Sequence, residues 1–185
     1  MKLIIFIILI ISFSKLTNAE IGSVTGLELP RFISIKTNDA NIRVGPSKNY
    51  PILIKYIKNN FPLEVIEEYD QWRKVRDFKN HIGWIHKSLI SGKRTGILIS
   101  KENYKIEIFN TTDGYIIGSI GYGNIVSIHK CKIDWCLISI ENFKGWVSKK
   151  NIWGVNQNET FKLSYLQNIQ DLYWLSINLL RKIFY

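Results

Sequence analysis

The sequence predicts an all-β protein built as two tandem small barrels, with an export signal before them and an amphipathic helix after them. Two observations predict the barrels. Short runs rich in β-branched and aromatic residues alternate with turn residues, and no helical period occurs before residue 160. In addition, Trp72 and Gly83-Trp84 recur as Trp135 and Gly145-Trp146, at offsets of 63 and 62 residues.

The first 19 residues have the three-part layout of a secretory signal peptide. Lys2 precedes an apolar run that ends at Phe13, and Ala19 suits a cleavage site before Glu20. A retained anchor is the alternative, although a membrane span needs about 20 apolar residues. No cysteine lies near the cut, which excludes a lipid-modified N-terminal cysteine. We therefore expect an exported protein in the periplasm or cell envelope.

The first copy of the repeat covers residues 31–95. Proline, glycine and asparagine separate its apolar runs, as turn chemistry requires. The strands are expected at residues 31–36, 42–44, 52–56, 63–69, 72–77 and 81–86. A domain of this size buries only about 60% of its extended-chain surface. We therefore expect Trp84 and Trp146 to lie in or near the two cores, and Gly83 and Gly145 to permit close backbone approach.

The second copy covers residues 101–155 and contains both cysteines. Residues 126–140 predict a hairpin with its tip at Lys132 to Trp135. Cys131 and Cys136 would face each other across it and form a disulfide in an oxidising compartment. A metal site that adds His129 is an alternative, but no fourth ligand is apparent. A redox pair is another, although the spacing differs from that of a CxxC site.

Composition excludes several classes of protein. The formal net charge of +10 and the 46% hydrophobic content rule out an acidic or disordered chain. Loss of Lys2 and Lys15 with the signal lowers that charge from +10 to +8. The basic residues are interspersed with acidic ones, so nucleic-acid binding is not expected. The basicity instead favours attraction to anionic envelope material.

Residues 160–184 predict an amphipathic α-helix, because apolar residues recur there at spacings of three and four. The stripe runs from Leu166 to Phe184 and is too short to span a bilayer. It could pack on the second barrel, lie in a membrane surface, or pair with another protein. These three possibilities stay open.

Three motifs occur in order in the first copy, namely residues 41–47 followed by Tyr50-Pro51, residues 72–75 with Trp72 at the start, and Gly83-Trp84-Ile85. Together they resemble the bacterial SH3-like domain, in the variant found in exported alphaproteobacterial proteins. Gly45 and Pro46 belong to the first of these motifs. In the second copy Glu107, Phe109 and Asn110 stand where the first has Arg43, Gly45 and Pro46, so that copy is divergent. The resemblance implies SH3-type barrels of five to six strands, an envelope location, and binding rather than catalysis. In some family members the ligand is peptidoglycan or its peptide stems.

The sequence offers a binding patch and no catalytic set. The candidate ligand-binding residues are cations and aromatic residues on or near the loop after residue 44, namely Arg43, Lys48, Tyr50, Tyr56 and Trp72. Such groups could hold a peptide by stacking and by ion pairs with its carboxylates. No nucleophile with a base, cofactor fingerprint or metal set is apparent. We expect a binding or scaffold protein of the envelope without cofactors or metals; the alternative is an accessory or inhibitory subunit of a cell-wall hydrolase.

Overall fold

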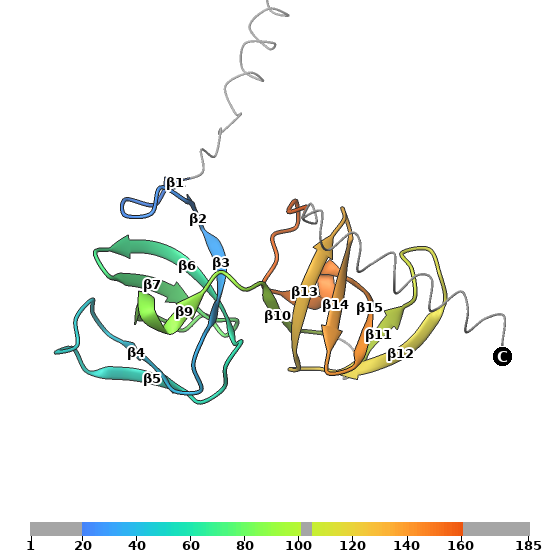
Figure 1. Ribbon diagram of the computed structural model, residues 1–185, viewed down its shortest axis with the longest axis horizontal. Coiled ribbons are helices and arrows are strands. Elements are labelled where there is room, and N and C mark those ends of the chain that lie inside the picture. Colours follow the sequence, from blue (N-terminus) through green and yellow to red (C-terminus); the bar gives the residue numbers. More distant parts are fainter. Residues whose placement is uncertain (1–19, 101–104, 161–185) are drawn as a thin grey trace, which may run out of the picture.

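The computed structural model describes residues 20–100 and 105–160 (Figure 1). The predicted signal peptide and, except for Thr160, the predicted C-terminal helix lie outside this part. Two β-barrels follow each other along the chain, as the repeat predicts. Within the described ranges, no helix has the length and apolarity that a membrane crossing requires.

The first barrel is a curled sheet of seven strands in the order β5-β4-β8-β7-β6-β3-β9. Each strand predicted for this copy is present, to within two residues. The strands are β3 (Arg31–Ile35), β4 (Ala40–Arg43), β5 (Ile52–Tyr56), β6 (Pro62–Tyr69), β7 (Trp72–Arg76), β8 (Ile82–His86) and β9 (Ile90–Ser91). A 3-10 turn, η1 (Lys87–Leu89), separates the last two. Before them, β1 (Glu20–Ile21) and β2 (Glu28–Leu29) form a separate ribbon.

The second barrel repeats this plan in the order β12-β11-β15-β14-β13-β10-β16. Its strands are β10 (Thr95–Leu98), β11 (Lys105–Phe109), β12 (Ile116–Gly121), β13 (Ile125–Cys131), β14 (Trp135–Ile140), β15 (Phe143–Ser148) and β16 (Ile152–Trp153), with η2 (Lys149–Asn151) before the last. The barrel thus begins at Thr95 and not near residue 101, because β10 pairs with both β13 and β16. The run from Thr95 to Leu98 is fully buried, as an interior strand requires.

Each barrel encloses its own core of aliphatic side chains. Ile35, Leu63, Val65 and Ile85 belong to the first core, and Ile138 belongs to the second. Gly83 and Gly145 face these cores, because a Cβ on either would collide with Ile42 or Ile108 respectively. The glycines therefore let neighbouring strands approach closely, as their position predicted.

The tryptophans that follow these glycines lie on the opposite face of their strands. Alternation along β8 places Gly83 and Ile85 inward and Trp84 outward. Trp84 is buried there under Tyr69 and the Lys74 ammonium, which lies 5.7 Å from its ring. The prediction places both tryptophans in or near the cores. Trp84 is buried, but on the outer face of its strand, and aliphatic residues fill the interior of each barrel.

The two barrels contact each other through aromatic and polar groups. Phe32 meets Trp153 edge-on, with ring centroids 5.2 Å apart. The Thr95 hydroxyl donates to the carbonyl of Asn60 at 2.7 Å and lies 2.6 Å from the Ser34 hydroxyl. Both hydroxyls are buried, so these bonds satisfy polar groups that the interface removes from water.

Candidate ligand pocket

Three of the five predicted binding residues gather on the turn between β4 and β5. Arg43 Nη1 donates to the carbonyl of Tyr50 at 2.7 Å. The Tyr50 ring packs directly on Gly45, where any Cβ would overlap it, and Pro46 is half-buried beside it. Lys48 is exposed on the same turn. Arg43, Lys48 and Tyr50 thus form one small cationic and aromatic surface.

The other two predicted residues lie apart from this surface. Trp72 is only 8% exposed and meets His86 edge-on at 5.3 Å, so neither of its ring faces is open to a ligand. Tyr56 pairs with Ala40 at the far end of the β4–β5 ladder from Arg43. The structure therefore splits the predicted patch and puts Tyr56 in a different site.

That site is an open pocket of about 730 Å³ between β5 and the β7–β8 hairpin. Its volume is in the range of small-ligand pockets. The walls are mostly apolar or aromatic, and the polar groups are concentrated in the hairpin. The lining residues are Leu53, Ile54, Tyr56, Phe61, Asp77, Phe78, Lys79, His81 and Ile82.

Asp77 organises the polar end of the pocket. Its Oδ1 accepts from the backbone N–H groups of Lys79 and His81, both at 2.9 Å. Its Oδ2 accepts from the Tyr56 hydroxyl at 2.7 Å and lies 2.9 Å from His81 Nδ1. The turn allows this because Asn80 adopts a positive φ of 65°, which asparagine tolerates well.

The electrostatics of this network keep the charge on Asp77. Burial alone would raise the pKa of Asp77, but hydrogen bonds from Tyr56, His81 and Lys79 hold it below its ordinary value. Burial and the neighbouring carboxylate raise the pKa of Tyr56, so its hydroxyl keeps its proton. The neutral Tyr56 hydroxyl and the ionised Asp77 form a stable donor and acceptor pair. No metal set accompanies it: the described residues contain no group of three His, Cys, Asp or Glu placed to bind an ion.

Comparison with known proteins decides the family. A family model described as "Bacterial SH3 domain" matches residues 36–92 and 112–154, which together make up more than half of the chain. The chain belongs to the bacterial SH3 domain family. No curated protein matches it.

Distant matches to this bacterial SH3 protein occur among solved structures. The structures of NlpC2 and NlpC1 from Trichomonas vaginalis share 10% and 11% identity with it, over 67% and 71% of this chain and 48% of theirs, each with a TM-score of 0.29. An NlpC/P60 family protein from Bacillus cereus ATCC 10987 shares 10% identity over 66% of this chain and 55% of its own, with a TM-score of 0.30. The chain thus spans about half the length of these proteins.

The second bacterial SH3 barrel does not repeat the pocket. The strand registers place Ile120, Ile140 and Phe143 at the positions of Tyr56, Asp77 and His81. The Phe143 ring lies over Gly118, and a Cβ added to Gly118 would be 2.9 Å from Cζ of that ring. The second barrel therefore fills the corresponding hollow with its own side chain and carries no polar group there.

The same registers correct the alignment of the two copies. Arg43 pairs with Trp84 in the first barrel, and Phe109 pairs with Trp146 in the second. Phe109, and not Glu107, is thus the counterpart of Arg43. Phe109 contacts Trp135 edge-on at 5.1 Å, and Trp146 lies 5.0 Å from the Lys132 ammonium. This surface of the second barrel has aromatic contacts where the first has Arg43.

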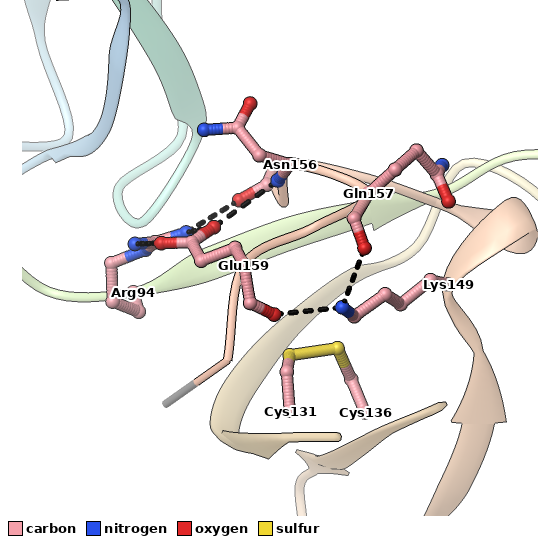
Figure 2. The surroundings of a disulfide bond; sticks show 8 residues. Arg94, Cys131, Cys136, Lys149, Asn156, Gln157 and Glu159 are labelled. Carbon is pink, nitrogen blue, oxygen red and sulfur yellow. Dashed lines mark hydrogen bonds and ion pairs between the residues drawn. A yellow bond between two sulfur atoms is a disulfide. The ribbon is translucent and has the colours of Figure 1, made fainter. Parts of the chain in front are cut away.

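A covalent and ionic cluster closes the second barrel (Figure 2). Cys131 and Cys136 form a disulfide, which confirms the predicted pairing at the hairpin. Beside it the buried Lys149 ammonium donates to the carbonyls of Gln157 and Glu159, at 2.9 and 2.7 Å. Arg94 binds the Glu159 carboxylate through two nitrogens and thereby ties this segment to the start of the barrel. Burial lowers the pKa of Lys149, although nearby carboxylates oppose the shift.

Sequence reasoning missed Asp77 and His81. The available signal was local: an aspartate stands four residues before a histidine, with Asn80 between them. Asp and Asn in a short turn indicate side-chain bonds to the backbone, and these bonds aim His81 back at Asp77.

Proposed function

We propose that this chain is an exported, non-catalytic binding protein of the cell envelope, and that its first barrel binds peptidoglycan, its peptide stems or an envelope protein. The observation that carries this proposal is the pocket at Tyr56, Asp77 and His81. It is open, it has apolar walls, and its polar groups are held in fixed positions by Asp77. Pockets of this composition are typical of ligand sites.

Binding is better supported than catalysis by the lining itself. Among the described residues that line the pocket there is no serine, threonine or cysteine, so the Asp77 and His81 pair has no aliphatic hydroxyl or thiol beside it to activate. The Tyr56 proton is already donated to Asp77. The pair therefore acts as a fixed recognition group in this proposal.

An envelope location agrees with the covalent chemistry and the charge of the chain. Disulfides persist in oxidising compartments outside the cytoplasm, and the Cys131–Cys136 bond closes the second barrel. The formal charge of +8 that remains after loss of the predicted signal, +10 less Lys2 and Lys15, would attract the protein to anionic envelope polymers at long range. The surface of Arg43, Lys48 and Tyr50 would add to this attraction, while the pocket supplies the specific contact.

Co-sedimentation with isolated cell wall tests the proposal. The protein should pellet with the wall at low salt, and His81→Gln should weaken this binding by about tenfold if one well-placed charge-assisted contact is lost. His86→Gln is the matched control and should bind like the unmodified protein, because His86 lies outside the pocket. Arg43→Ala should lower binding mainly at low salt. Failure of the unmodified protein to pellet at low salt would refute the proposal.

A further inference from the structure

The hydrogen bonds of the pocket define which kind of ligand group it can accept. A carboxylate offers about four acceptor positions. In Asp77 all four are in use, by the N–H groups of Lys79 and His81, the Tyr56 hydroxyl and His81 Nδ1. Asp77 therefore has no position left for a ligand, and its role is to orient Tyr56 and His81.

Tyr56 and His81 then present only acceptors to the pocket. The Tyr56 proton is committed to Asp77, so the hydroxyl offers its remaining lone pair. Nδ1 of His81 must carry a proton to reach the ionised Asp77, so in the neutral imidazole Nε2 is an acceptor. A ligand group that binds both must be a hydrogen-bond donor.

The aromatic walls favour a positively charged donor. The rings of Tyr56, Phe61 and Phe78 follow one another along the pocket, with centroids 4.5 and 6.1 Å apart. The ammonium of Lys79 lies 5.6 Å from the Phe78 ring, so one cation of the protein itself already rests on this wall. Aromatic faces attract ammonium groups by their quadrupoles.

We propose that this pocket binds a primary ammonium group on a short apolar stem, and thus selects the amine-bearing part of a peptide. An ammonium brings three donors to the two acceptors, a hydroxyl brings one, and a carboxylate brings none. The inference rests on the proposed function in taking the pocket as the ligand site, and it adds the chemical class of the group that enters it.

A titration with three six-carbon probes tests this class directly. Hexylammonium, hexanol and hexanoate share one apolar stem and differ only at the head group. At about pH 8, hexylammonium should shift the amide NMR signals of Lys79 and His81. Hexanol should bind about tenfold more weakly and hexanoate more weakly still. Equal affinity for the three probes, or tighter binding of hexanoate, would overturn the proposal.

Matched variants identify the groups responsible. Tyr56→Phe and His81→Gln should each weaken hexylammonium binding by about fivefold or more. Tyr122→Phe and His86→Gln make the same chemical changes outside the pocket and should leave hexylammonium binding unchanged. If all four variants bind hexylammonium equally, the acceptor pair does not recognise it and the proposal fails.

Lys79→Gln tests whether the pocket prefers a positively charged ligand. Removing the resident cation should strengthen hexylammonium binding by about threefold, because Lys79 no longer competes for the aromatic wall. In a site that binds carboxylates, the removal of Lys79 would instead weaken the binding of hexanoate. Weaker binding of hexylammonium by Lys79→Gln would overturn the proposal.

The proposed function and the proposed ligand class can fail separately. Hexylammonium binding without cell-wall binding would refute the envelope function alone, and cell-wall binding without preference among the probes would refute the ligand class alone.

Discussion

The two barrels link the same pair of neighbouring strands by different chemistry, at one buried pair of positions. In the first barrel Glu68 pairs with Arg73 across β6 and β7. In the second barrel Cys131 pairs with Cys136 across β13 and β14, at the same distance in register from the bulge. A salt bridge with an Nε to Oε1 distance of 3.4 Å thus stands where the second barrel has its disulfide. Each connects two strands near the tip of the hairpin.

The salt bridge does more than connect two strands. Glu68 also accepts from the backbone N–H groups of Val24 and Thr25, at 2.9 and 2.8 Å, and from the Thr25 hydroxyl at 2.7 Å. Arg31 binds the same carboxylate at 2.6 Å. The first barrel therefore holds its leading loop through an ionised group, while the second is closed by a covalent bond. The difference makes the first barrel sensitive to pH and the second sensitive to reduction.

The largest expected effect comes from Glu68→Gln. The change leaves the guanidinium groups of Arg31 and Arg73 without their buried counter-charge and weakens the bonds to the leading loop. Loss of one partner of a buried ion pair costs about 3 to 5 kcal/mol. Denaturant unfolding monitored by NMR signals of each barrel should show this loss in the first barrel. Glu67→Gln is the control, since its pair with Lys74 is exposed and should contribute less than about 1 kcal/mol.

Acid should reproduce this effect in the unmodified protein. Burial tends to raise the pKa of Glu68, but hydrogen bonds from Thr25, Arg31 and Val24 lower it from 4.5 to about 2. Because the folded-state pKa is depressed, the stabilisation is complete above about pH 4.5 and is lost as the pH falls towards 2. Glu68→Gln should flatten this part of the pH profile. A profile that is as steep as that of the unmodified protein would show that another group is responsible.

Sequence reasoning predicted the features that depend on local pattern. Strands of the first barrel follow from alternation and turn residues, and the disulfide follows from two cysteines that flank a hairpin tip. Inward or outward orientation was harder to predict. The β7–β8 ladder is regular, so alternation puts Trp84 on the face opposite to Gly83. Which of these two faces lines the core depends on strand pairing and not on residue type.

The pocket could not be predicted as a unit because its parts come from separate elements. Tyr56 lies at the end of β5, and Asp77 and His81 flank the turn between β7 and β8. The contact between these side chains depends on one residue that this turn has in addition to the corresponding turn of the second barrel. Three residues separate Asp77 from His81, whereas two separate Ile140 from Phe143. The longer turn gives Asp77 access to two backbone N–H groups, and the 62 to 63 residue repeat does not reveal this difference.

Reduction of the Cys131–Cys136 disulfide should have the next largest effect. A bridge across so short a loop stabilises a domain by about 2 kcal/mol, mainly by restricting the unfolded chain. The reduced protein should lose this amount in the second barrel, while the first barrel, which has no cysteine, keeps its stability. Unfolding with and without dithiothreitol, followed by signals from each barrel, measures the difference. An equal loss in both barrels would mean that they unfold as one unit.

Phe143→Ala should have the smallest effect on stability. It also tests most directly why, of the two barrels, the first has a polar pocket. Phe143 is 42% exposed, so its removal should cost only about 1 kcal/mol of hydrophobic burial. It uncovers Gly118 and opens a hollow beside Ile120 and Ile140, without any acceptor. The hollow should therefore bind hexanol and hexylammonium equally weakly. If Phe143→Ala bound hexylammonium as tightly as the first barrel is expected to, shape alone would explain recognition, and the difference between Asp77 and Ile140 would have no bearing on binding.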